Sequence, residues 1–109
     1  MIKIHQVLRS GSSILLGIGI ENAVLDVLTD VSQLNECLKL LQERRQGLQY
    51  AQMGSFGGYR VRLNAENEKT VSIFIDGPDF EPTRTQSAAI WLEREELRQL
   101  LIDILRDVS

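Results

Sequence analysis

The stretch ILLGIGIENAVLDVLTDVSQLNECLKLL, residues 14–41, decides the fold class, because the spacing of its apolar residues changes within it from two to about three and a half. Its first seven residues place isoleucine or leucine at every second position, which is typical of a strand with one buried face. The run 23–28 is apolar on both parities apart from Asp26, and it indicates a short, well-buried strand, with a helix as the alternative. The later apolar positions follow the helical spacing i, i+3, i+4 and i+7: Leu34, Cys37, Leu38 and Leu41.

Capping signals set the ends of this first helix, which we predict over about 31–46. Asp30 stands immediately before it and Gln33 three residues later, which is the spacing of a capping box. Arg44 and Arg45 lie where cations interact favourably with the negative end of the helix dipole, and Gly47 is a typical stop.

The rest of the chain adds strands on both sides of this stretch and one further helix. The other predicted strands, marked by alternation and turn signals, are residues 2–8, 48–53, 59–63, 70–76 and 87–92. Residues 54–58 form a glycine-rich hairpin loop, and 77–85 contain both prolines and must be irregular. A second helix follows over about 93–107. We therefore predict one α+β domain over 1–109, an antiparallel β-meander of six to seven strands packed against two helices.

Gly17 and Gly19 lie on the parity opposite the buried face of their strand. Glycine inside a strand often marks a bend or the close approach of another backbone. We expect a sharply twisted sheet here, with a groove that receives a partner as the alternative.

Composition excludes several classes of protein. The chain of 109 residues has 43% hydrophobic and 25% charged residues, as is typical of a globular protein. No apolar run approaches the roughly 18 residues of a membrane-spanning helix. The first residues lack the pattern of a signal peptide, and one cysteine cannot form an intrachain disulfide. We therefore expect a cytoplasmic protein without a membrane anchor. Twelve basic against 15 acidic residues give a net charge of −3, which disfavours binding of a polyphosphate by bulk attraction.

Residues that usually carry catalysis are scarce. His5 is the only histidine, and Cys37 lies on the apolar stripe of the first helix, where cysteine acts as a small hydrophobe. Two such residues cannot complete a zinc site, and neither glycine group matches a phosphate-binding loop. We predict a non-catalytic protein without metal or cofactor, for which carboxylate chemistry is the only visible route to enzyme activity.

An acidic set at the proline-bearing loop is the predicted contact for a protein partner: Asp76, Asp79, Phe80 and Glu81. Three carboxylates within six residues suit a basic partner. A solvated acidic loop and a weak site for a divalent cation are the alternatives, although the spacing is not that of an EF-hand.

Strand 59–63 provides a positive face. Its apolar residues point one way, so Arg60 and Arg62 project together from the other side. If Phe74 on the next strand shares this side, two guanidinium groups lie beside an aromatic ring, as on surfaces that bind single-stranded nucleic acid. An ordinary exposed sheet face is the structural alternative.

The last predicted strand, 87–92, is apolar on both parities and includes Trp91, and Ile102 lies outside the main apolar stripe of the second helix. Apolar surface in excess of one buried face indicates an interface, for which a homodimer is the simplest form. A second buried face is the alternative.

From TDVSQL at 29–34 through the meander to IWLEREEL at 90–97, the chain resembles the small cytoplasmic immunity proteins of bacterial toxin–immunity systems. The resemblance lies in size, mild acidity and element order, and it implies a protein that blocks a toxin by burying its active site. The chain is also similar in organisation to whirly and PUR-type single-strand nucleic-acid binders, whose contact would map by topology onto Arg60 and Arg62. Net negative charge and three lysines depart from that second group. We therefore expect an immunity-type inhibitor, with single-stranded nucleic-acid binding as the alternative.

Overall fold

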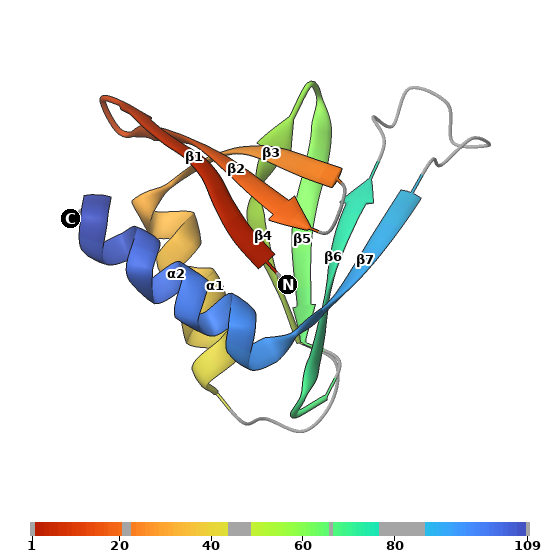
Figure 1. Cartoon of the computed structure of the whole chain (residues 1–109). Coiled ribbons are helices and arrows are strands. Elements are labelled where there is room, and N and C mark those ends of the chain that lie inside the picture. Colours follow the sequence, from red (N-terminus) through yellow and green to blue (C-terminus); the bar gives the residue numbers. More distant parts are fainter. Residues whose placement is uncertain (1, 21–22, 44–48, 66, 77–86, 109) are drawn as a thin grey trace.

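The computed structural model describes residues 2–20, 23–43, 49–65, 67–76 and 87–108. Within these residues, seven strands form one antiparallel sheet in chain order, and two helices pack against it (Figure 1). The predicted α+β class and antiparallel meander are thereby confirmed. The elements are β1 (Ile2–Ser10), β2 (Ser13–Ile20), β3 (Ala23–Asp30), α1 (Val31–Gln42), β4 (Gln49–Phe56), β5 (Tyr59–Ala65), β6 (Thr70–Asp76), β7 (Ser87–Glu93) and α2 (Arg94–Val108).

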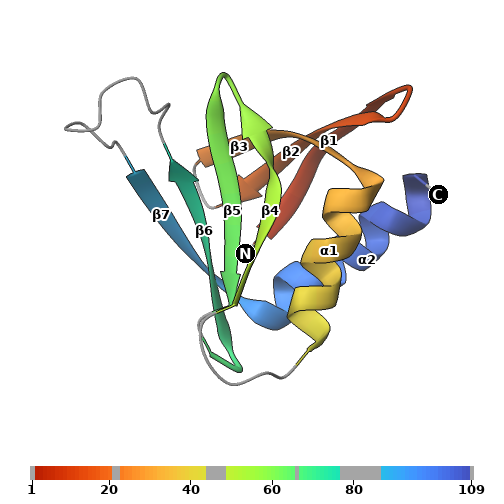
Figure 2. The same ribbon diagram turned by 180° about the vertical axis from the view of Figure 1, so that it is seen from behind.

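The sheet bends between β3 and β4, where Leu28 and Ser55 are the one register pair among the described residues. The strands β1–β3 run across the β4–β7 half at a steep angle in both views (Figures 1 and 2). Helix α1 packs on β3 and β4, and α2 packs on α1, β1 and β7. One face of the sheet therefore meets the helices, and the other faces outward.

Gly54 allows β4 to approach β3 closely at this bend. It stands at a bulge of β4, and a Cβ atom there would lie 2.5 Å from both the carbonyl oxygen of Leu28 and Cγ1 of Val27. No side chain fits that space, so the bend requires glycine.

The hairpin after β4 is tighter than the predicted loop over 54–58. Strand β4 continues to Phe56, and the turn itself consists of Gly57 and Gly58, with φ values of 56° and 86°. Two consecutive residues at positive φ are the requirement of the two-residue hairpin turn whose twist matches that of the strands.

Helix α1 begins as predicted and ends earlier. The Asp30 carboxylate accepts a hydrogen bond from the Gln33 amide nitrogen at 2.8 Å, and the Gln33 side chain donates back to it at 3.3 Å. The helix ends at Gln42 because Glu43 adopts an extended conformation. The predicted stop at Arg44, Arg45 and Gly47 lies outside the described residues.

Two arginines from distant parts of the chain bind the C-terminal carbonyls of the helices. Arg94 donates to the carbonyl oxygens of Leu41 at 3.0 Å, Leu40 at 3.2 Å and Glu43 at 2.7 Å, and also to that of Asn67 at 2.9 Å. On β1, the guanidinium of Arg9 donates to the carbonyl oxygen of Val108. These bonds satisfy carbonyls that a helix leaves unpaired at its end, and they hold the helices to the sheet.

The core lies between the bent sheet and the helices. Its largest fully buried side chains are Ile14, Leu16, Ile18, Val27, Leu34, Met53, Val61, Leu63, Ile73, Leu97, Leu101 and Ile104. The expectation that β3 is buried on both faces is wrong, because Val24 and Leu28 are 55% and 48% exposed on the face that no helix covers. Neither helix of the described part is long and apolar enough to cross a membrane.

Candidate binding face on the β4–β7 half of the sheet

Side chains that alternate with the core residues of β4–β7 form an outward face. The register places Gln52, Arg62 and Phe74 in one row across β4, β5 and β6. The next row runs across all four strands and contains Tyr50, Asn64, Ser72 and Trp91. We call Tyr50, Arg62, Phe74 and Trp91 the aromatic–arginine face.

Arg62 lies at the centre of this face. Its guanidinium carbon is 5.5 Å from the ring centre of Tyr50 and 5.6 Å from that of Phe74, so an aromatic ring from each neighbouring strand contacts it. Tyr50 is 68% exposed and Trp91 is 59% exposed, whereas Ser72 between them is buried. The face therefore presents large aromatic surface to solvent around one fixed cation.

Arg62 has an incomplete set of polar partners. Its Nε atom is buried and donates to no partner among the described residues, and no carboxylate of that part of the chain forms an ion pair with its guanidinium. Because the Nε–H is buried, the bonding capacity that Arg62 can offer to a ligand lies in the terminal nitrogens of its half-buried side chain, whose charge no carboxylate of the described residues neutralises.

Of the residues predicted for nucleic-acid binding, Arg62 and Phe74 are brought into direct contact, and Arg60 projects from the same side of β5. Arg60 is exposed and stands opposite Asp76 in the register of β5 and β6. Positive and negative side chains therefore share the end of this face.

Of the residues predicted to contact a basic partner, the structure places Asp76 at the end of β6, where it is half-buried. Asp79, Phe80 and Glu81 lie outside the described residues. The acidic set therefore stays a prediction.

Cys37 and His5 are the two residues weighed as catalytic. The Cys37 thiol is buried and donates to the carbonyl oxygen of Gln52 at 3.6 Å, and burial raises its pKa to about 12. An activated thiol needs the opposite shift. The imidazole of His5 lies over Gly19, 2.3 Å from where a Cβ would stand. The space over Gly19 is thus filled by a side chain of the same sheet.

Among the described residues, no three His, Cys, Asp or Glu side chains lie together in a group that could hold a metal ion.

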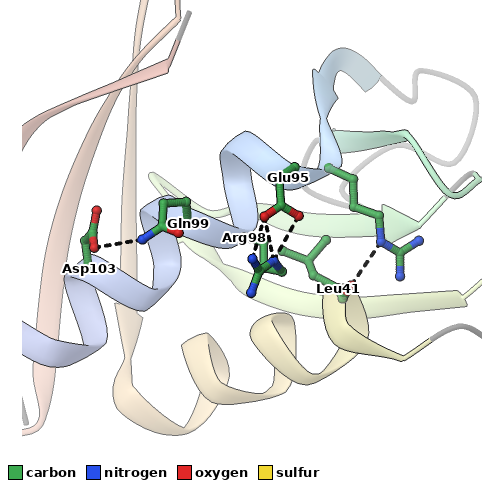
Figure 3. A network of polar contacts seen from close by, with 6 residues as sticks. Leu41, Glu95, Arg98, Gln99 and Asp103 are labelled. Atoms are coloured by element: carbon green, nitrogen blue, oxygen red, sulfur yellow. Dashed lines mark hydrogen bonds and ion pairs between the residues drawn. The ribbon is translucent and has the colours of Figure 1, made fainter.

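A pocket of about 750 Å³ lies where α1 ends and α2 begins, with Arg94, Arg98 and Glu95 in its lining. Arg98 pairs with Glu95, and the hydrogen bond from Arg98 lowers the pKa of that carboxyl, while Gln99 donates to Asp103 along the same helix (Figure 3). The arginines of this pocket already have partners, so it serves as a structural junction.

Comparison of the chain with family models, curated proteins and solved structures gave no significant match.

Sequence reasoning identified Arg62 and Phe74 but missed the part of Tyr50, and it treated Trp91 only as excess apolar surface. The missing signal was the register, because Tyr50 joins Arg62 only through the bulged pairing of β4 with β5. Alternation within β4 and β7 could have placed both aromatic residues on the arginine side once that pairing was assumed.

Proposed function

We propose that this chain is a non-catalytic protein-binding module that acts as an immunity-type inhibitor, and that the aromatic–arginine face covers its partner. The observation that carries the proposal is the exposure of Tyr50 and Trp91 around Arg62. Tryptophan, tyrosine and arginine are the residue types that dominate the binding energy of protein interfaces. Aromatic surface left exposed in a cluster is typical of an interaction site.

The immunity-type role rests in addition on the element order. Helix α1, the meander β4–β6, strand β7 and helix α2 follow one another as in the proteins that the sequence resembles. Such an inhibitor acts in the cytoplasm by covering the active site of a toxin. Asp76, with Asp79, Phe80 and Glu81 beyond it, remains our proposed contact for basic residues at the rim.

Single-stranded nucleic acid is the second candidate, favoured by the contact between Arg62 and Phe74. Stacking of bases on an aromatic ring beside arginine is a common mode of such binding. Against it stand the net charge of −3 and the position of Asp76 opposite Arg60. A phosphate backbone needs several cations in succession, and this face offers two.

Capture from a lysate of the source cells tests the proposal when three baits are compared by quantitative mass spectrometry. The wild type is compared with Tyr50→Ser/Trp91→Ser and with the matched control Leu8→Ser/Leu28→Ser, whose leucines are 56% and 48% exposed on the other half of the sheet. We expect one protein partner that is retained by the control and lost by the first variant, and whose activity the wild type inhibits. Equal loss from both variants would contradict the proposed surface.

A titration with single-stranded DNA and RNA over a series of salt concentrations separates the two candidates. Micromolar binding that weakens steeply with salt and is lost in Arg60→Ala/Arg62→Ala would replace the inhibitor proposal with the nucleic-acid one.

A further inference from the structure

We infer that Arg62 is a receptor for a carboxylate, so that the partner segment bound by the aromatic–arginine face presents an Asp or Glu side chain to it and an apolar side chain to Trp91. The inference rests on the proposed protein-binding function and names the chemistry of the partner. It differs from the basic partner that the acidic set at Asp76 to Glu81 suits, because it assigns the centre of the face to an acidic group.

The guanidinium of Arg62 is held in place before any partner arrives. Rings on both neighbouring strands contact it, at 5.5 Å for Tyr50 and 5.6 Å for Phe74. Arginine loses much side-chain freedom when it is fixed at an interface, and a guanidinium that is already immobilised avoids that loss on binding. Two flanking rings also favour a planar cation over an ammonium group.

Its unsatisfied bonding capacity defines the ligand. Aromatic rings offer no lone pairs in the guanidinium plane, and no carboxylate of the described residues neutralises Arg62. A carboxylate is planar and accepts two parallel N–H bonds from the guanidinium fork. Such charge-assisted, bidentate pairs are stronger than neutral hydrogen bonds and fix the geometry of the two groups. Partial removal of water by the surrounding rings strengthens such a pair.

The surroundings favour one carboxylate over a chain of phosphates. By register and alternation, the charged side chains of this face within the described part are Arg60, Arg62, Asp76 and Glu93, which sum to zero. Arg62 offers one cationic group to a single carboxylate, whereas successive phosphates would meet Asp76 and Glu93. The exposed rings of Tyr50 and Trp91 on either side then contact apolar residues that flank the acidic one.

The register sets the spacing of the partner motif. Trp91 lies two strands from Arg62 and one row along the sheet, a separation of about 12 Å from standard strand spacings. An extended peptide covers that distance in about three to four residues. The expected partner segment therefore carries an acidic residue and an aromatic or large aliphatic residue three or four positions apart.

Selection from a phage-displayed library of random peptides tests this chemistry directly. Enriched peptides are synthesised, and their Kd values are measured by fluorescence anisotropy for the wild type, Arg62→Gln, Arg62→Lys and the control Arg106→Gln, an arginine on α2 that pairs with Asp103. We expect enrichment of the acidic–apolar spacing and at least tenfold weaker binding to Arg62→Gln. Replacement of the acidic residue of the peptide by its amide should weaken binding equally, and Arg106→Gln should match the wild type.

The conservative variant and a folding check separate recognition from structure. Arg62→Lys keeps the charge but lacks the planar fork, so an affinity between those of wild type and Arg62→Gln supports a bidentate carboxylate. Urea midpoints within error of the wild type show that the variants are folded.

Each other outcome overturns the inference in a distinguishable way. Peptides without an acidic residue, which bind Arg62→Gln normally but not Tyr50→Ser/Trp91→Ser, refute the carboxylate and leave the proposed function standing. Peptides insensitive to all these variants refute both, as does a library from which nothing is enriched. Displacement of the peptides by single-stranded DNA with loss of DNA binding in Arg62→Gln assigns the site to phosphate instead.

Discussion

Replacing Arg94 by methionine should lower the free energy of unfolding by about 4 kcal/mol. The guanidinium donates four hydrogen bonds, to the carbonyl oxygens of Leu40, Leu41, Glu43 and Asn67, over 2.7–3.2 Å. Each such bond contributes about 1 kcal/mol net, and methionine keeps most of the aliphatic stem but none of the donors. Because domains of this kind unfold with a total of about 5–15 kcal/mol, the loss is a large share of the stability.

Urea unfolding followed by circular dichroism measures this effect. With a slope of about 1.5 kcal/mol per molar urea, the midpoint should fall by about 2–3 M. Arg98→Met is the matched control, since Arg98 lies on the same helix and pairs with the exposed side chain of Glu95. A midpoint shift for Arg94→Met no larger than that for Arg98→Met would refute the reasoning that Arg94 joins α1, α2 and the turn before β6.

Two further predictions concern the bend of the sheet and the buried thiol. Gly54→Ala should destabilise the fold by about 2–3 kcal/mol in thermal or urea unfolding, because its Cβ would meet Leu28 and Val27 at 2.5 Å. Gly57→Asn is the control and should change the stability little, since nothing lies within 4 Å of a Cβ there and asparagine tolerates positive φ. An unaltered midpoint for Gly54→Ala would show that β3 and β4 are not in close contact there. Burial raises the pKa of Cys37 from 9.0 to about 12, so the folded chain holds this proton while the unfolded chain releases it. The free energy of unfolding should therefore be unaffected by this thiol below pH 9 and fall by up to about 1.4 kcal/mol per pH unit between pH 9 and 12. Cys37→Ala should remove this slope. Rapid alkylation of the native thiol at about pH 8 would contradict its burial.

Local signals predicted much of the fold. The change of hydrophobic period near residue 30 separates β3 from α1, and the hydrogen bonds between Asp30 and Gln33 mark the boundary because they span three residues. The end of α1 could not be predicted in this way. It depends on Arg94, which is 53 residues from Leu41 in the chain, as the end of α2 depends on Arg9, 99 residues from Val108.

The aromatic–arginine face could likewise be predicted only in part from local signals. That Arg60 and Arg62 project together follows from strand alternation alone, since the intervening Val61 is buried. The contacts of Arg62 with Tyr50 and Phe74 depend on the register of three strands, one pair of which is shifted by the bulge at Gly54. Burial of β3 was overestimated because apolar content on both parities does not say which face the helices cover.

Trp91 is the only tryptophan, so its fluorescence reports on the aromatic–arginine face without interference. The measurement that tests our central claim most directly is acrylamide quenching of this fluorescence in the free protein and in its complex with the captured partner or a selected acidic peptide. At 59% exposure, Trp91 should be quenched readily in the free protein, and binding should reduce the quenching several-fold and shift the emission to shorter wavelength. A complex in which Trp91 stays as accessible as in the free protein would contradict the claim that this face binds the partner.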